Sequence, residues 1–229
     1  MKKILTIVSV LSLFTFSANA FEVSDVTATV GISANQAVYG ASGTETNRDE
    51  SNDVRDVERE SGVFVDSHMS GFLELNMGEF VSLGYEHTPD SISTPENRRI
   101  TNVNTTTRVS VDFNDLNIAY LKLNIPGGIY VKAGVVETDI DVNETMASGT
   151  TYANVDTEGT IVGVGYSQAL EGGLAVRLEG SYMELDDVST NNGVSSTGAT
   201  VANGGRNQID VSDMEGLNAK LALTFTFGQ

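Results

Sequence analysis

The stretch GLNAKLALTFTFGQ, residues 216–229, decides the fold. From position 217 to 227 its odd positions are apolar, and the even positions between them are polar except for Ala222. Successive side chains of a β-strand point to opposite faces, so this alternation predicts a strand with one apolar and one polar face. The strand ends in Phe225 and Phe227 and keeps Lys220 off the apolar face. We therefore expect it to be the closing strand of a barrel in a bacterial outer membrane.

The first twenty residues have the pattern of a secretion signal. Lys2 and Lys3 precede an apolar run over 4–16, and small residues follow at Ala18 and Ala20. This pattern predicts a signal peptide, residues 1–20, that is cleaved after its last residue. The apolar run is too short for a spanning helix, which needs about 20 residues. A membrane protein with this sequence must therefore cross the lipid as a closed β-barrel.

Composition excludes several classes of function. The chain has 13 Lys and Arg residues against 31 Asp and Glu, and its net charge of -18 becomes more negative when the two lysines of the signal peptide are removed. Such a surface argues against nucleic acid as a partner. The chain has no Cys, which excludes disulfides and thiol chemistry. Prolines are few and no low-complexity linker is present, so we predict a single domain over residues 21–229 and no cofactor.

Eight segments alternate with a period of two, and the connections between them are long and short in turn. A soluble sandwich has no reason to sort its loops in this way, whereas an outer-membrane barrel has short periplasmic turns and long extracellular loops. We therefore predict an all-β fold, an eight-stranded antiparallel up-and-down transmembrane β-barrel. The expected strands are 26–34, 63–75, 80–87, a fourth that ends at 123, 129–135, 161–167, 174–182 and 217–227. The expected extracellular loops are 35–62, 88–107, 138–158 and 186–208.

The start of the fourth strand is ambiguous. Apolar residues at 109, 111 and 113 share the odd positions of Leu121 and Leu123, but positions 115 and 117 are polar. Positions 116, 118 and 120 are apolar on the even face instead. Either a β-bulge or a protruding extension of the strand would explain this change.

Aromatic residues indicate which face of the strands meets lipid. All of those near strand ends lie on the apolar face, and lipid-facing aromatic belts are expected at both membrane interfaces. We therefore predict that the apolar face points outward. The predicted upper belt contains Tyr85 and Tyr182, and the predicted lower belt contains Tyr166, Phe225 and Phe227.

The opposite face carries seven charged residues. An eight-stranded barrel has an interior just wide enough for side chains, so these charges must pair to offset their lost hydration. Glycines at 31, 84, 134, 163 and 165 leave room for them. We predict an internal salt-bridge cluster made of Glu74, Glu86, Lys122, Lys132, Arg177, Glu179 and Lys220.

These features together resemble a known family. A signal peptide, eight alternating strands, an inward charge cluster and the ending LALTFTF are similar to the small outer-membrane barrels of the OmpA transmembrane domain, OmpX and opacity-protein type. The resemblance implies contact with outer-membrane lipid and lipopolysaccharide, and assembly by the barrel-assembly machinery through the C-terminal strand. In that family the chain usually ends on the aromatic residue, whereas Gly228 and Gln229 follow Phe227 here.

Two local patterns suggest a catalytic or a metal-binding site, but each has a simpler interpretation. His68 and Ser70 share one strand face, and such a pair resembles that of the lipid A deacylases, where a His activates a Ser hydroxyl. No second motif supports this, and polar residues lining the lumen are the favoured explanation. The run from Asp139 to Glu144 spaces oxygen ligands like the start of a calcium loop, but Glu144 stands where such a loop needs Gly. We therefore predict no catalytic and no metal-binding residue.

The expected function is that of a non-enzymatic surface protein. Its extracellular loops would contact the environment in an adhesin-like manner, through a ligand that the sequence does not name. A small-solute or ion pore is the alternative, and a lipid-modifying barrel enzyme is a third, weaker possibility.

Overall fold

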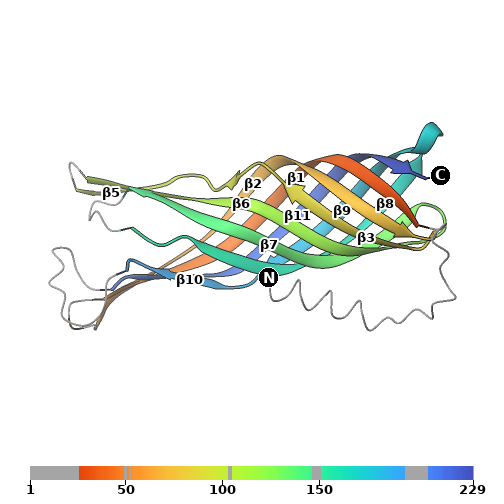
Figure 1. Ribbon diagram of the computed structural model, residues 1–229. Coiled ribbons are helices and arrows are strands. Elements are labelled where there is room, and N and C mark those ends of the chain that lie inside the picture. Colours follow the sequence, from red (N-terminus) through yellow and green to blue (C-terminus); the bar gives the residue numbers. More distant parts are fainter. Residues whose placement is uncertain are drawn as a thin grey trace.

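The computed structural model describes residues 26–48, 51, 53–102, 105–145, 151–193 and 206–228. The predicted signal peptide and Gln229 lie outside these residues. Figure 1 shows an elongated barrel of antiparallel strands. The strands are β1 (Val26–Arg48), β2 (Val54–Met77), β3 (Val81–Thr88), β4 (Ile92–Ser93), β5 (Asn97–Asn102), β6 (Thr105–Asn124), β7 (Ile129–Thr145), β8 (Val155–Ala169), β9 (Leu174–Leu185), β10 (Val188–Asn191) and β11 (Gln208–Phe227).

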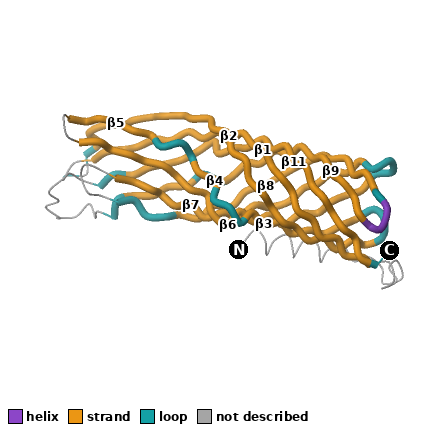
Figure 2. The backbone as a smooth tube through the Cα atoms, turned by 90° about the horizontal axis from the view of Figure 1, so that it is seen from above, coloured by secondary structure: helices purple, strands orange, loops and turns teal. Residues whose placement is uncertain are grey.

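Eight strands close the ring in the order β1-β2-β3-β6-β7-β8-β9-β11, and β11 pairs with β1. The short strands β4 and β5 pair with β6, and β10 pairs with β11, so they continue β3 and β9 past interruptions. The predicted fold class is therefore confirmed. Following paired residues once around the ring leads from Ala28 to Val38, ten positions further along the same strand. This stagger tilts the strands, as ring closure requires, and the tilt is visible in Figure 2.

Three tight turns join strands at one end of the barrel. They lie between β2 and β3, between β6 and β7, and between β8 and β9, where the short 3-10 helix η2 (Glu171–Gly173) forms the turn. Gly127 and Gly128 have φ values of 95° and 86°, which residues with a Cβ rarely adopt. The turn positions thus agree with the sequence prediction.

Three of the four predicted long loops are largely β-structure, and the fourth contains the short strand β10, which corrects the loop boundaries expected from sequence. β1 and β2 stay paired as far as Arg48 and Val54, within the expected loop 35–62. β6 and β7 stay paired out to Arg108 and Thr145. In this part of the barrel the outward face carries polar residues, so the pattern of the other half does not continue in the sequence although the ladder does. The barrel therefore extends well beyond its apolar half.

The hydrophobic pattern inverts along the barrel axis. In the half next to the turns, apolar side chains point outward and charged ones point inward. In the other half, apolar side chains form a buried core inside the barrel, which reaches down to Tyr120 beside the charged side chains: Ile92, Leu116, Ile118, Tyr120, Val136, Ile140, Ile161, Met183, Leu185 and Met214. We call this cluster the apolar layer. The outer half is thus built like a soluble barrel, with its apolar residues inside.

Two bulges accompany the inversion. Asp115 in β6 and Asp213 in β11 have φ values of 50° and 53°, and the register shifts beside both. Leu116 and Phe113, three residues apart, both pack in the apolar layer, which a regular strand would not allow. β6 therefore has both the bulge and the protruding extension that the sequence left as alternatives.

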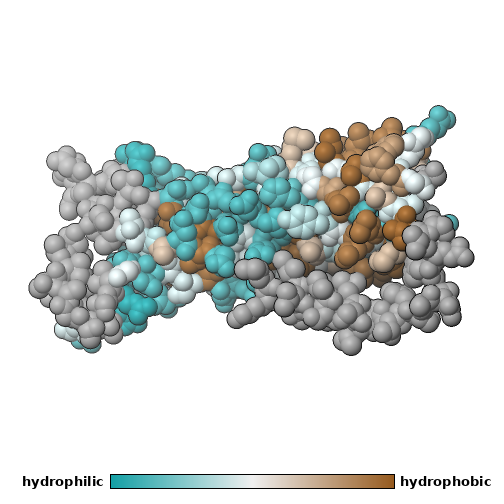
Figure 3. All heavy atoms as spheres, viewed as in Figure 1, coloured by the Kyte–Doolittle hydropathy of each residue, from teal (hydrophilic) through white to brown (hydrophobic). Residues whose placement is uncertain are grey.

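An apolar girdle surrounds the half of the barrel next to the turns. Its residues include Ile32, Leu73, Val164, Leu178 and Leu221, each 48–61% exposed. Figure 3 shows this girdle in brown at the turn end, and hydrophilic residues dominate the visible face of the other half. Such a belt would be unstable in water and is suited to lipid. Among the described residues, no helix is long and apolar enough to cross a membrane.

The wall is interrupted beside β3. β2 pairs with β3 only from Gly71 to Met77, and Pro89, which has no N–H to donate, follows the end of β3. Within the described residues, no backbone pairing joins β2 to β4 or β5, which pair with β6. The upper part of β2 therefore has a ladder on one side only.

Candidate functional site

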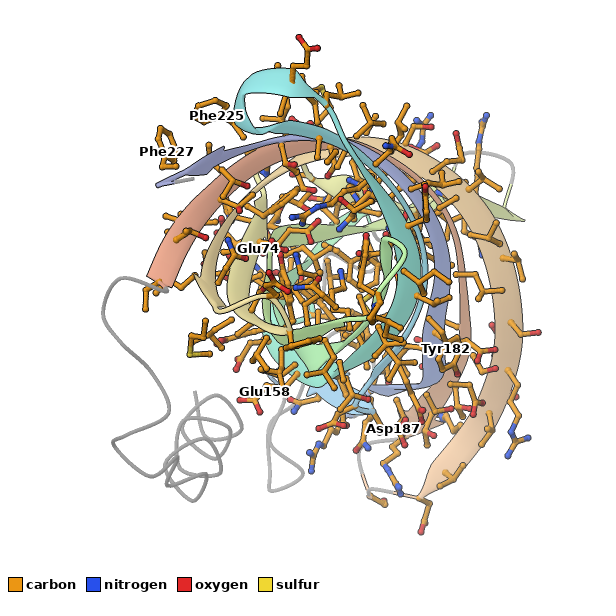
Figure 4. All side chains as sticks on the ribbon, turned by 90° about the vertical axis from the view of Figure 1, so that its right-hand side faces the viewer. Glu74, Glu158, Tyr182, Asp187, Phe225 and Phe227 are labelled. Carbon is orange, nitrogen blue, oxygen red and sulfur yellow. The ribbon has the colours of Figure 1, made fainter. Side chains whose placement is uncertain are left out.

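Seven charged side chains meet inside the half of the barrel that carries the girdle. They come from β2, β3, β6, β7, β9 and β11, and their exposure ranges from 1% for Glu74 to 9% for Arg177. Figure 4 shows Glu74 pointing into the lumen, while Phe225 and Phe227 lie outside the wall. The seven are the residues predicted from the sequence: Glu74, Glu86, Lys122, Lys132, Arg177, Glu179 and Lys220. We call them the ionic layer.

Glu74 holds one half of the ionic layer. Its carboxylate accepts two hydrogen bonds from the Arg177 guanidinium, at 2.8 and 2.9 Å, and one from Lys122 Nζ at 2.5 Å. The Tyr120 hydroxyl donates a fourth, at 2.9 Å. A bidentate arginine contact is strong and fixes the geometry of both groups. The side chains from three strands are therefore locked together across the lumen.

Glu86 and Glu179 hold the other half. Lys220 Nζ lies 2.6 Å from Glu86 and 3.6 Å from Glu179, and Lys132 Nζ lies 2.5 Å from Glu179 and 3.7 Å from Glu86. The Ser70 hydroxyl also donates to Glu86, at 2.6 Å. Each lysine thus bridges both carboxylates. The interior charges pair with one another, as buried charges must.

Three inward aromatic residues, which the sequence analysis missed, complete this layer. Phe72 lies directly opposite Gly31, Tyr120 opposite Gly84 and Tyr130 opposite Gly165. A Cβ at Gly84 would lie 2.2 Å from the ring of Tyr120, so only glycine admits that ring. Lys132 Nζ lies 4.8 Å from the centre of the Tyr120 ring, within range of a cation–π contact. The signal for these rings was a glycine at the paired position of the neighbouring strand.

His68 and Ser70 do not form a nucleophile pair. The Ser70 hydroxyl bonds to Ser33 Oγ at 2.6 Å and to Glu86, whereas His68 Nδ1 lies 3.3 Å from Asp66. No hydrogen bond between His68 and Ser70 occurs in the described part of the chain. Both side chains are buried polar residues of the lumen.

The run Asp139–Glu144 lies on β7 and forms part of a strand, not of a loop tip. Its odd-numbered acidic residues lie on the outer face, and Asp139 is exposed; the side chain of Glu144 lies outside the described set. Among the described residues, no group of three or more His, Cys, Asp or Glu side chains is placed to hold a metal ion.

The five predicted belt aromatics lie on the outside of the barrel. Four are exposed and Phe225 is half-buried, edge-to-face with Phe227 at a centroid distance of 4.7 Å. At the outer end of the girdle, the Tyr85 hydroxyl donates to Asn117 and the Tyr182 hydroxyl donates to Glu215. Each ring thus covers apolar surface while its hydroxyl reaches polar groups, as interfacial tyrosines do.

The arrangement of strands matches that of a solved outer-membrane protein. The outer membrane protein OprG from Pseudomonas aeruginosa aligns with 86% of this chain and 96% of its own, with a TM-score of 0.54 and 10% identity. The fold is that of a small outer-membrane β-barrel. The outer membrane protease OmpT from Escherichia coli (10% identity, 88% of this chain and 97% of its own) has a TM-score of 0.46. Ail of Yersinia pestis (8% identity, 86% of this chain and 99% of its own) has a TM-score of 0.38.

No protein-family model matches this sequence, and no curated protein is detectably similar to it. The likeness to OprG therefore establishes the barrel fold and not an activity. Together with the apolar girdle, it places the protein in the bacterial outer membrane, in contact with lipid and lipopolysaccharide. The predicted fold type and location are thereby confirmed. In this membrane the tight turns are periplasmic and the extended half is extracellular.

Proposed function

We propose that this outer-membrane barrel is a non-enzymatic surface-interaction protein, and that its extended extracellular half is the contacting surface. The observation that carries the proposal is the continuation of paired strands, with the apolar layer inside, beyond the lipid-facing girdle. A barrel that served only as a membrane anchor would not need this second, water-facing half. Packed strands also present a surface with less conformational entropy to lose on binding than loose loops would have.

The outer face of this half is acidic. Four pairs of acidic residues lie directly opposite each other on neighbouring strands: Glu137 and Glu158, Asp139 and Asp156, Asp112 and Asp141, and Glu184 and Glu215. Like charges in this position lower the stability of a sheet. A surface that keeps them favours basic partners through electrostatic attraction.

The interior argues against the pore alternative. The ionic layer joins side chains from six strands, and three aromatic rings fill the space beside it. The apolar layer lies above it. An ion would have to separate several buried ion pairs and cross a hydrocarbon-lined segment. We therefore expect no steady single-channel steps in planar-bilayer recordings, and regular large steps would favour the pore.

Cell attachment tests the surface function directly. The displayed wild-type protein is compared with a variant in which residues 43–60, the outer end of the β1–β2 hairpin, are replaced by a four-residue turn. We expect the variant to reach the membrane, shown by its heat-modifiable gel mobility, but to lose most attachment to cationic surfaces and host cells. A variant in the periplasmic turn, Glu171→Gln, should attach like the wild type. Equal attachment by the shortened hairpin would overturn the proposal.

A further inference from the structure

An apolar cavity of about 60 Å³ lies within the apolar layer. The side chains that line it include Tyr39, Phe64, Ile92, Phe113, Met183 and Met214. Cavities of this kind stay dry and accept apolar molecules, because water finds no hydrogen-bond partners in them and the lining atoms lack dispersion contacts. The cavity is therefore suited to a hydrocarbon group.

A second cavity of about 30 Å³ adjoins the first on the side of the ionic layer. Tyr39, Leu116 and Met183 line both cavities. The lining of the smaller cavity is mixed: beside apolar side chains it includes Asn218, His68 and the ion pair of Lys220 with Glu86. The larger cavity, which we call the apolar chamber, thus lies above the polar groups of the smaller cavity, which we call the floor.

Among the described residues that line the smaller cavity, one buried side-chain acceptor has no hydrogen-bond partner. Asn35 Nδ2 donates to Ser33 and Ser70, which leaves Asn35 Oδ1 to accept from Asn218 Nδ2 at 3.0 Å. This network fixes the orientation of the Asn218 amide. Its Oδ1 is buried and has no hydrogen-bond partner among the described residues. A buried acceptor without a partner costs stability, which a donor on a ligand would restore.

We propose that the two cavities form one binding site for a small amphipathic molecule that has an apolar body and a hydroxyl head. The body would fill the apolar chamber, and the hydroxyl would donate to Asn218 Oδ1. Lys220 and Glu86 neutralise each other on the floor, so a neutral head fits better than an ion. Phe64 on β2 and Ile92 on β4 line the chamber from the two sides of the unpaired stretch of wall, and the molecule would enter between them.

Methionine methyl NMR in lipid nanodiscs tests this site with benzyl alcohol as the probe and toluene as its matched hydrocarbon. Met183 and Met214 line the chamber, whereas Met69 is 54% exposed on the lipid-facing side and reports partitioning of the probe into lipid. We expect the Met183 and Met214 signals to shift saturably with benzyl alcohol. The Met69 signal should change only in proportion to the probe concentration.

Three variants separate the parts of the site. Ala41→Phe fills the chamber and should abolish the saturable shifts, whereas Ala34→Phe, on the lipid face, should not. Asn218→Leu should weaken the binding of benzyl alcohol by about 3- to 10-fold, which corresponds to the loss of one hydrogen bond. The affinity for toluene should not change. The methyl spectrum without probe shows whether each variant is folded.

Two results would overturn the proposal. One is an absence of saturable shifts at Met183 and Met214 in the folded wild type. The other is equal affinity for benzyl alcohol and toluene that Asn218→Leu does not alter, because the hydroxyl head would then have no recognised position.

Discussion

Glu74 is the residue on which half of the ionic layer depends. It is 1% exposed and accepts hydrogen bonds from Lys122, Arg177 and Tyr120. A buried ion pair gains little over apolar residues of the same volume, but removing one partner leaves the other charge uncompensated. Single substitutions in the ionic layer should therefore lower the stability of the barrel far more than their small change in side-chain volume suggests.

Replacing Glu74 by Gln should lower the free energy of unfolding by about 3–5 kcal/mol, because the cations of Lys122 and Arg177 lose their counter-charge. Urea titration in lipid vesicles, followed by far-ultraviolet circular dichroism, measures the change. Glu184→Gln is the matched control, since Glu184 is exposed and faces Glu215. The control should be as stable as the wild type or slightly more stable, because it removes one charge of a like-charged pair. A midpoint for Glu74→Gln equal to that of the wild type would contradict the role of the ion pairs.

Gly84 should not tolerate a methyl group. A Cβ there would meet the Tyr120 ring at 2.2 Å, and overpacking typically costs about 1–3 kcal/mol. Gly180→Ala provides the comparison, because a Cβ at Gly180 has no heavy atom within 4 Å. The same urea titration should show a lower free energy of unfolding for Gly84→Ala and an unchanged one for Gly180→Ala. Equal stability of the two variants would mean that the ring can move aside.

At the scale of the element, the bulges matter most. Asp115 and Asp213 take left-handed backbone angles, and each allows its strand to keep apolar residues inside after the hydrophobic pattern has inverted. Asp is among the few residues with a Cβ that adopt this conformation readily. The two strands that carry these bulges, β6 and β11, are also the longest strands after β1 and β2.

Replacing Asp115 by Val should destabilise the barrel by about 1–2 kcal/mol, because a β-branched residue is strained at positive φ. Asp115→Gly should be neutral or stabilising, since glycine adopts such angles at no steric cost. Unfolding midpoints of the two variants give the comparison. Equal losses for Val and Gly would show that the carboxylate matters and that the backbone angle does not.

At the scale of the whole molecule, lipid surrounds one half of the barrel wall and water surrounds the other half. Leu221 belongs to the girdle and is 56% exposed, whereas Thr160 is exposed on the outer face beside Glu184. The same substitution should therefore lower stability at the first position and leave it unchanged at the second.

Leu221→Arg should cost about 2–4 kcal/mol of stability in a bilayer, the range for a cation on the lipid face at mid-depth. Thr160→Arg should be neutral, because it places the same side chain in water among acidic residues. Folding into vesicles, read from heat-modifiable gel mobility, distinguishes the two. Efficient insertion of Leu221→Arg would reverse the assignment of the two faces.

The sequence predicted the membrane half of the fold well, because lipid forces every outward residue there to be apolar. It predicted the upper half poorly, since water is outside and the apolar layer inside, so the alternation changes sign where β6 and β11 bulge. The seven charged residues were found from one rule, that charges avoid lipid. Phe72, Tyr120 and Tyr130 were missed because the same rule does not identify apolar rings on a polar face.

The pairing of β1 with β11 also governs how the chain can fold. Thr29 and Thr226 share a hydrogen bond of 2.8 Å across 197 residues of sequence. No local hairpin can substitute for this contact, and contacts of such long sequence separation form slowly. Until the last strand is synthesised and docked, both edges of the sheet would present unpaired N–H and C=O groups to hydrocarbon. Insertion must therefore await the complete chain, and a truncation before β11 should leave an assembly intermediate in the periplasm for proteases to remove.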